Sequence, residues 1–232
     1  GFFHGLSLAR RVDLLHGHCL SPFCLGALLA ARLRGRPMAI KLCSVGDEGD
    51  IASLGCPAAR RPLWAIFRKA ELFFAQTTEV VEELVQAGVA AERIAMLPGL
   101  VENGIARSSR VPRQRMREQL AVPDRPTLLY VGRLHPGKGL QELRAAWDRL
   151  ERESSAQLVL VGDGPEWARL QDWRRQLAEP DRVYLAGYQP DPSDYYDAAD
   201  ILVFPSHSES FGNVVLEAMS RGLAVVSTDV GV

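Results

Sequence analysis

Short runs of apolar and β-branched residues alternate along the chain with stretches of helical periodicity. The apolar runs are almost continuous, which is typical of parallel strands that are buried on both faces. We predict strands at residues 12–16, 38–43, 72–77, 93–97, 127–131, 157–161, 183–186, 201–204 and 224–227. We predict helices between them, at residues 22–34, 61–70, 79–87 and 214–220 among others. The alternation predicts an α/β protein with doubly wound parallel sheets.

The stretch 98–126 interrupts this alternation. It is rich in glycine, proline, serine and arginine, and only residues 115–120 have a helical pattern. We therefore predict a first domain over 1–100, a linker over 101–126 and a second domain over 127–232. The chain opens without a methionine shortly before a strand and ends directly after one, so we expect a fragment that lacks the start of the first domain and the end of the second.

Composition and charge exclude several classes of protein. The 232 residues carry 27 basic and 28 acidic side chains, and 47% of the residues are apolar. These values are ordinary for a soluble globular protein, and they indicate no nucleic-acid partner. No apolar run reaches the ~20 residues of a membrane span. The four cysteines form no C-x-x-C pair and no metal pattern with nearby histidines, so we expect reduced thiols in a cytoplasmic protein.

A glycine-rich turn follows the predicted strand 127–131. It contains Arg133 and Lys138, and Lys138 stands between two glycines in a chain with only three lysines. A turn of this kind before a helix presents backbone N–H groups to an anion. An arginine side chain can donate two hydrogen bonds to phosphate oxygens at once, and a lysine side chain acts as a point charge. The two cations can therefore neutralise a diphosphate without a metal. A solvated loop is the alternative.

The same turn is close to a Walker A loop. The hydroxyl residue that would hold Mg²⁺ is replaced by Gly139, and Asp163 is the best candidate for a second metal ligand, although it stands in a Gly-Asp-Gly-Pro turn. A P-loop hydrolase is therefore a weaker interpretation. The dinucleotide-binding fingerprint is absent.

Two glutamates flank the start of the predicted helix 214–220. Glu209 precedes the helix and Glu217 lies two turns later, with Ser210 as the expected N-cap. Carboxylates accept hydrogen bonds from vicinal sugar hydroxyls, and the amides of Phe211, Gly212 and Asn213 offer a second anion site. A capping acid and a solvated helix face are the alternatives.

Together, these two segments resemble the retaining, metal-independent glycosyltransferases of family four. The resemblance lies in Val131-Gly132-Arg133-Leu134…Gly137-Lys138-Gly139 and in Pro205-Ser206…Glu209-Ser210-Phe211-Gly212…Glu217-Ala218-Met219, the E-x7-E signature of the family. It covers most of residues 127–232 and is looser before them. It implies the GT-B fold, in which two Rossmann-like domains face each other across a cleft.

The resemblance also implies an activity and roles for particular residues. A sugar would pass from a nucleotide-diphosphate donor to a carbohydrate or lipid-linked acceptor, with retention of anomeric configuration and with no metal or other cofactor. The resemblance implies that Arg133 and Lys138 bind the diphosphate, and that Glu209 and His18 contact the transferred sugar. Glu217 would bind the ribose, and Tyr188 and Gln189 would contact the nucleobase. The amides of Phe211, Gly212, Asn213 and Val214 would bind sugar and phosphate oxygens. His18 could be exchanged with His16, which we expect to be buried. The loop 43–50 would face the acceptor.

The sequence departs from the family pattern in two places. The usual Pro-Asn-Gly-Val-Asp run is replaced here at residues 97–105, and the family's N-terminal glycine-rich loop and C-terminal crossing helix lie outside the sequence. We therefore expect residues 1–232 to be inactive by themselves. A GT-B epimerase, a glycogen-type phosphorylase and a non-catalytic nucleotide-sugar or glycan-binding module are the alternatives.

A basic stretch falls in the predicted linker. Its five arginines could contact anionic lipid at the inner face of the membrane, and a solvated linker is the alternative. They are Arg107, Arg110, Arg113, Arg115 and Arg117.

Overall fold

The computed structural model describes residues 2–46, 49–99, 113–209 and 211–230. The chain divides into two compact units, Gly1–Gly99 and, for the most part, Leu100–His207 with Gly212–Val230. Each described unit contains a sheet whose strands are all parallel. The predicted α/β class is confirmed.

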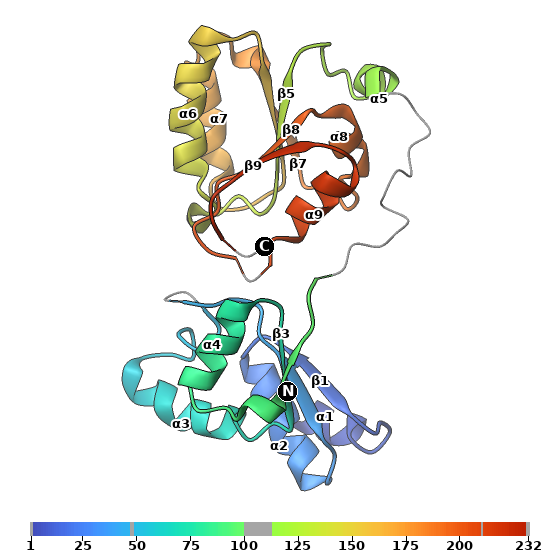
Figure 1. The fold of residues 1–232 in the computed structure, drawn as a ribbon, viewed down its shortest axis with the longest axis vertical. Helices are drawn as coiled ribbons and strands as arrows, with labels where there is room; N and C mark the ends of the chain where they lie inside the picture. The colour runs from blue at the N-terminus through green and yellow to red at the C-terminus, as the bar shows by residue number, and fades with distance from the viewer. Residues whose placement is uncertain (1, 47–48, 100–112, 210, 231–232) are drawn as a thin grey trace. The chain divides into compact units, whose positions relative to one another are not determined.

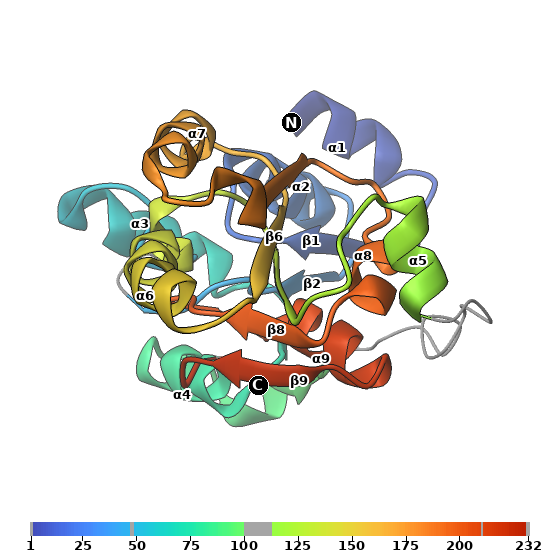
Figure 2. The same ribbon diagram turned by 90° about the horizontal axis from the view of Figure 1, so that it is seen from above.

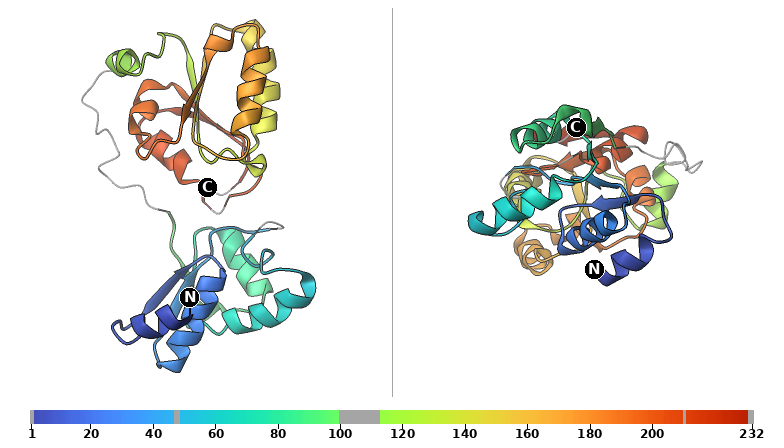
Figure 3. Two further views of the ribbon diagram at one scale, coloured as in Figure 1. Left: turned by 180° about the vertical axis from the view of Figure 1, so that it is seen from behind. Right: turned by 90° about the horizontal axis from the view of Figure 1, so that it is seen from below.

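The first unit is built on the sheet β1-β2-β3-β4. Its elements are α1 (Phe2–Leu8), β1 (Leu15–His18), α2 (Pro22–Leu33), β2 (Met38–Lys41), α3 (Pro57–Phe67), β3 (Leu72–Ala75), α4 (Thr78–Gln86) and β4 (Ile94–Met96). The pattern did not predict α1, which packs against α2 (Figure 3). Gly5 permits this packing, because a Cβ there would stand 3.1 Å from the Cβ of Ala30.

Alternation along the strands decides which side chains enter the core of this unit. Met38, Ile40 and Phe73 point into one apolar cluster with side chains of α2, α3 and α4. The residues between them on the strands belong to the opposite face of the sheet. On that face His16 lies in ring contact with His18 and with Phe74.

The second unit contains the sheet β7-β6-β5-β8-β9. Its elements are α5 (Arg113–Gln119), β5 (Thr127–Val131), α6 (Leu140–Glu153), β6 (Gln157–Val161), α7 (Trp167–Gln176), β7 (Val183–Gly187), α8 (Ser193–Ala198), β8 (Ile201–Phe204), α9 (Asn213–Ser220) and β9 (Ala224–Ser227). Four of the five predicted strands match to the residue, and the fifth, β7, is one residue longer. Helices cover both faces of this sheet, α6 and α7 one face and α8 and α9 the other (Figure 1).

Two separate apolar clusters correspond to the two faces of this sheet. Along β5, Leu129 and Val131 join the cluster of α8 and α9. Tyr130 joins Trp147 and Trp173 in the cluster of α6 and α7. Successive side chains of β5 point to opposite faces, and both faces are covered by helices. This is why the strand is apolar at almost every position.

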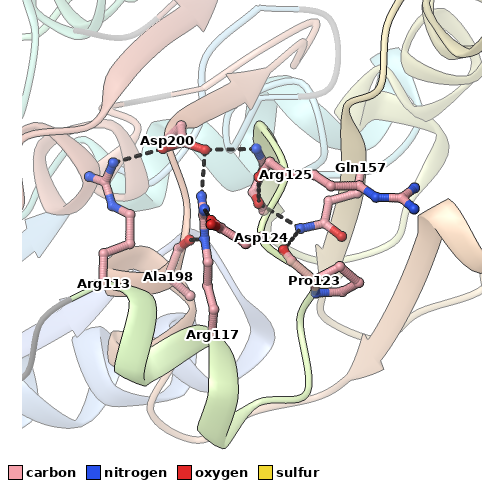
Figure 4. Close-up of polar contacts among 9 residues, drawn as sticks. Arg113, Arg117, Pro123, Asp124, Arg125, Gln157, Ala198 and Asp200 are labelled. Atoms are coloured by element: carbon pink, nitrogen blue, oxygen red, sulfur yellow. Dashed lines mark hydrogen bonds and ion pairs between the residues drawn. The ribbon is translucent and has the colours of Figure 1, made fainter.

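The predicted linker is too long at its C-terminal end. Helix α5 packs beside α8 (Figure 2), so residues 113–126 belong to the second unit. Arg117 is 7% exposed, and its guanidinium donates to the backbone carbonyl of Ala198 at 2.9 Å and pairs with Asp124 and Asp200 at 2.7 and 2.6 Å. Figure 4 shows Asp200 at the centre of this network.

Asp200 joins three parts of the second unit. One oxygen pairs with Arg113 at 2.7 Å, and the other accepts from the backbone N–H of Thr127 at 2.8 Å as well as from Arg117 (Figure 4). The carboxylate thus fastens α5 to the start of β5. Arg113 and Arg117 are engaged in this network, and the lipid contact of the basic stretch stays a prediction. Arg107 and Arg110 lie outside the described residues.

Candidate nucleotide-sugar site

The glycine-rich turn follows β5 as predicted, but it does not lead straight into the helix. A 3₁₀ turn, Pro136–Lys138, comes first, and Gly139 with a φ of 65° connects it to α6. The side chain of His135 caps this turn by accepting from the N–H of Gly137 at 3.3 Å. Lys138 closes the turn and is half-buried.

The position of Arg133 is set through its backbone. The hydroxyl of Tyr130 donates to the Arg133 carbonyl at 3.0 Å, while the Arg133 residue itself is exposed. The next residue, Leu134, is completely buried in the cluster beneath α6. The buried side chain of Leu134 thus fixes the turn directly beside the exposed Arg133.

A second turn, after β6, supports the glycine-rich turn. The Leu134 N–H donates to the Asp163 carbonyl at 2.9 Å, and a Cβ at Gly164 would stand 2.4 Å from the Leu134 carbonyl oxygen. The Asp163 carboxylate accepts from the N–H of Gly164 at 2.7 Å. Asp163 thus shapes a turn, as expected for its Gly-Asp-Gly-Pro context.

The two signature segments are held together inside the second unit. The Gly137 carbonyl accepts from the His207 N–H at 3.1 Å and from the Ser206 hydroxyl at 3.4 Å. The His207 imidazole pairs with Glu142 on α6 at 3.1 Å. At Gly139 the contact is so close that a Cβ would stand 1.8 Å from the Pro205 carbonyl oxygen. The glycine is therefore required here by its neighbour as well as by its φ.

Helix α9 begins at a different residue from the one predicted. Its N-cap is Gly212, with a φ of 79°, and the prediction of Ser210 is wrong; Ser210 itself lies outside the described residues. Glycine tolerates this left-handed conformation and makes no side-chain cap bond. The first amides of the helix, from Asn213 and Val214, are of the kind that helix geometry leaves without intrahelical acceptors.

Glu217 is oriented by a residue that the pattern did not reveal. The hydroxyl of Tyr196, on α8, donates to the Glu217 carboxylate at 2.8 Å. Burial, and then the Glu217 carboxylate, raises the pKa of the Tyr196 phenol far above its usual value, so the phenol stays a donor. At the C-cap of α9, Arg221 pairs with Asp197 of α8 at 2.7 Å. Nothing in the residue spacing signals a tyrosine 21 positions before its partner.

The candidate nucleobase residues follow β7. Tyr188 is 72% exposed, and the side-chain amide of Gln189 donates to the Ala186 carbonyl at 3.0 Å. Because the strands are parallel, the turns after β5, β6, β7 and β8 all emerge at the same edge of the sheet, where open α/β folds bind ligands. Glu209 and Phe211 fall in the segment Ser208–Phe211, outside the compact body of the second unit, so their part in the site stays a prediction.

In the first unit, His18 is exposed and is the last residue of β1, whereas the predicted strand ended at residue 16. His16 is exposed as well, and the expectation that it is buried is wrong, because residues two apart on a strand share a face. Partial burial, and then the charges of His18 and Lys41, lowers the pKa of His16. The loop that starts at Cys43 follows the adjacent strand, β2.

The fold and this arrangement of turns define a class of protein. Two units, each built on a parallel α/β sheet, are the architecture of GT-B glycosyltransferases. An Anabaena protein, Alr3699/HepE, solved in complex with UDP-glucose, matches 99% of this chain and 63% of its own, with a TM-score of 0.84 and 24% sequence identity. At this level of identity the likeness shows the fold.

The family follows from the sequence. A model of the glycosyl transferases group 1 matches residues 112–232, and a model of the glycosyl transferase 4-like domain matches residues 2–99. The chain belongs to the group 1 glycosyltransferase family. The first model begins at residue 112, which agrees with the place of α5 in the second unit.

Two glycosyltransferases are related to this chain in sequence. A GDP-mannose-dependent α-mannosyltransferase of Mycobacterium tuberculosis (strain CDC 1551 / Oshkosh) is 32% identical over 99% of this chain and 59% of its own length. The sulfoquinovosyl transferase SQD2 of Arabidopsis thaliana is 33% identical over 74% of this chain and 34% of its own. The chain thus spans between a third and three fifths of the length of these two relatives.

None of the helices in the described part of the chain combines the length and the apolar character needed to cross a bilayer.

Proposed function

We propose that this protein transfers a hexose from a nucleotide-diphosphate sugar to a carbohydrate or lipid-linked acceptor, with retention of anomeric configuration and without a metal. The observation that carries the proposal is the attachment of the glycine-rich turn to the segment after β8 through the Gly137 carbonyl. It holds the cation-bearing turn against Ser206 and His207, which precede the helix that carries Glu217 in the chain. Membership of the group 1 family supports the same conclusion.

In this proposal Arg133 and Lys138 bind the donor diphosphate. When the bond between the anomeric carbon and the diphosphate oxygen breaks, the electron pair stays on that oxygen, and the two cations stabilise the charge. The acceptor hydroxyl oxygen bonds to the anomeric carbon on the same face, and its proton passes to the departing diphosphate. Retention of configuration follows from this geometry.

The remaining residues position the donor. Glu217 accepts from the ribose hydroxyls, and the amides at the start of α9 bind phosphate and sugar oxygens. Glu209 and His18 contact the transferred sugar, and Tyr188 with Gln189 contacts the base. The resemblance to the family supports these roles.

Ligand binding tests the proposal on this chain. The midpoint of thermal unfolding is measured with UDP, GDP, ADP and ATP, each with Mg²⁺ and with EDTA. We expect one nucleoside diphosphate to stabilise the chain equally in both conditions, and we expect Glu217→Ala to abolish the effect. Stabilisation by ATP alone, and only with Mg²⁺, would favour the P-loop interpretation instead.

Because the chain spans only part of the length of its relatives, turnover is measured on a protein that covers their whole length, here called the full-length protein. Sugar transfer from the matching nucleotide sugar in EDTA, with the product's anomeric configuration assigned by NMR, would support the proposal. If the full-length protein neither transfers nor hydrolyses any of these donors, the proposal is wrong and a non-catalytic binding module becomes the better interpretation.

A further inference from the structure

Two cysteines and an aspartate meet in the first unit, at the ends of neighbouring strands β1 and β2. Cys19 follows β1 directly, and its N–H donates to the Lys41 carbonyl at the end of β2 at 3.0 Å. Cys43 lies two residues beyond β2. The two Sγ atoms and a carboxylate oxygen of Asp50 all lie within 4.8 Å of one another. Cys43 lies 24 positions after Cys19, and Asp50 lies 7 positions after Cys43, so the sequence pattern did not indicate this cluster.

Asp50 connects the two segments that carry the thiols. It is 6% exposed, and its carboxylate accepts from the backbone N–H of Leu20 at 3.4 Å, of Cys43, and of Ser44 at 3.3 Å. These donors stand next to or at the two cysteines. The carboxylate therefore holds the two thiols close to each other before any ligand arrives.

The charge of Asp50 lacks a cationic partner. Within residues 2–46, 49–99, 113–209 and 211–230, no lysine, arginine or histidine lies within ion-pair distance of its carboxylate. A buried charge is costly unless a countercharge or a metal offsets it, and hydrogen bonds alone offset only part of that cost.

We propose that Cys19, Cys43 and Asp50 form a binding site for a soft divalent cation, Zn²⁺ above all. Thiolate sulfur and carboxylate oxygen bind zinc at about 2.3 and 2.0–2.2 Å, which places neighbouring ligand atoms about 3.3–3.8 Å apart in a tetrahedron. The observed limit of 4.8 Å lies within a small side-chain adjustment of that geometry.

Binding requires no redox partner. Two metal–sulfur bonds form as two S–H bonds release their protons to water, and the carboxylate supplies the third ligand. Cys19 and Cys43 are only half-buried, so a water molecule can reach the fourth position. Three protein ligands with an open position resemble an exchangeable site more than a closed structural one. The inference does not rest on the proposed sugar transfer, because the two thiols, the carboxylate and the backbone N–H groups that hold it are contacts within the first unit alone.

Cobalt titration of the metal-free, fully reduced chain tests the site. We expect Co²⁺ to bind with one-to-one stoichiometry, to give a thiolate-to-cobalt charge-transfer band in the near ultraviolet, and to be displaced by Zn²⁺. Cys19→Ser and Cys43→Ser should each weaken zinc binding by at least ~100-fold, by analogy with the 10–100-fold loss for outer-shell changes.

Cys56→Ser is the matched control, because Cys56 is an exposed cysteine of the same unit and is not part of the cluster. It should bind Co²⁺ like the unchanged chain. Asp50→Asn keeps the shape of the side chain and one acceptor oxygen while removing the charge, and circular dichroism will show whether each variant is folded.

Several outcomes would overturn the proposal. The first is cobalt binding without a charge-transfer band, and the second is unchanged zinc affinity in folded Cys19→Ser. The third is a Cys19–Cys43 disulfide that persists in the reduced preparation, detected by mass spectrometry after thiol alkylation, because it would identify the pair as a redox element. Since nucleotide binding is read out separately, failure of this site leaves the glycosyltransferase proposal unaffected.

Discussion

The Tyr196 hydroxyl donates a hydrogen bond of 2.8 Å to the carboxylate of Glu217. Tyr196 is 1% exposed and lies on α8, whereas Glu217 lies on α9. A second link between these helices, Asp197 to Arg221 at 2.7 Å, keeps the two partners in register. Glu217 therefore offers its remaining acceptor sites in a fixed direction, as a carboxylate that binds vicinal hydroxyls requires.

Removing the Tyr196 hydroxyl should weaken donor binding in the full-length protein. For Tyr196→Phe we expect the KM for the nucleotide sugar to rise about tenfold with kcat little changed, because a hydrogen bond to a charged group contributes ~1.5–3 kcal/mol. Steady-state kinetics with varied donor measure both constants. Tyr184→Phe, at a 46% exposed position on β7, is the control. A lower melting temperature with unchanged KM would show that Tyr196 is only structural.

The contact between Gly139 and Pro205 should make Gly139 intolerant of any side chain. Gly139→Ala adds a clash with the Pro205 carbonyl oxygen to the cost of a left-handed alanine, about 1–2 kcal/mol. Gly222→Ala shares that cost, since its φ is 77°, but meets no atom within 4 Å. Urea unfolding should therefore show a larger loss for Gly139→Ala, by ~1–3 kcal/mol. Equal losses would mean that the two segments are not in close contact.

Asp200 should contribute strongly to the stability of the second unit. Asp200→Ala leaves the buried Arg117 without one carboxylate and the Thr127 N–H without its acceptor, and we expect a loss of about 2–3 kcal/mol in the free energy of unfolding. Asp124→Ala removes the other partner of Arg117, but its side chain is 76% exposed, and the loss should stay below ~1 kcal/mol. Urea denaturation followed by tryptophan fluorescence compares the two. The reverse order would place the centre of the network at Asp124.

The two cations of the glycine-rich turn should control turnover in the full-length protein. Arg133→Ala and Lys138→Ala should each reduce kcat by ~10²–10³, the scale for loss of one electrostatic donor at a developing charge. Arg149→Ala, an exposed arginine on α6, is the matched control and should retain normal activity. Near-normal turnover in either test variant would remove that residue from the diphosphate site.

His16 should titrate below its usual range. Its pKa is lowered by partial burial and by the charges of His18 and Lys41, so the imidazole should stay neutral until the pH falls below 6.5. The unfolded chain then binds more protons than the folded one, and stability falls as the pH drops through 6.5. His18→Gln removes one cause, and the His16 pKa measured by NMR should rise. An unchanged value would mean that the ring contact of 4.5 Å does not persist in solution.

Periodicity located most of the strands and the two turns that carry the signature residues, because buried parallel strands are nearly continuous in apolar residues. Four strands of the second unit were predicted to the residue. The pattern failed where tertiary contacts decide. Residues 113–126 look like a polar linker, yet Arg117 is buried there because Asp200, 83 positions away, neutralises it.

The sequence by itself determined the α/β class, the family signature and the identity of the cations and carboxylates. Those properties reside in local pattern and residue type. Only the tertiary structure decided that Gly139 packs on Pro205, that Tyr196 orients Glu217, and that Cys19 and Cys43 meet at Asp50. Each of these contacts joins segments that emerge from neighbouring elements of the fold, and the spacing of residues along a chain carries no information about which side chains meet across it.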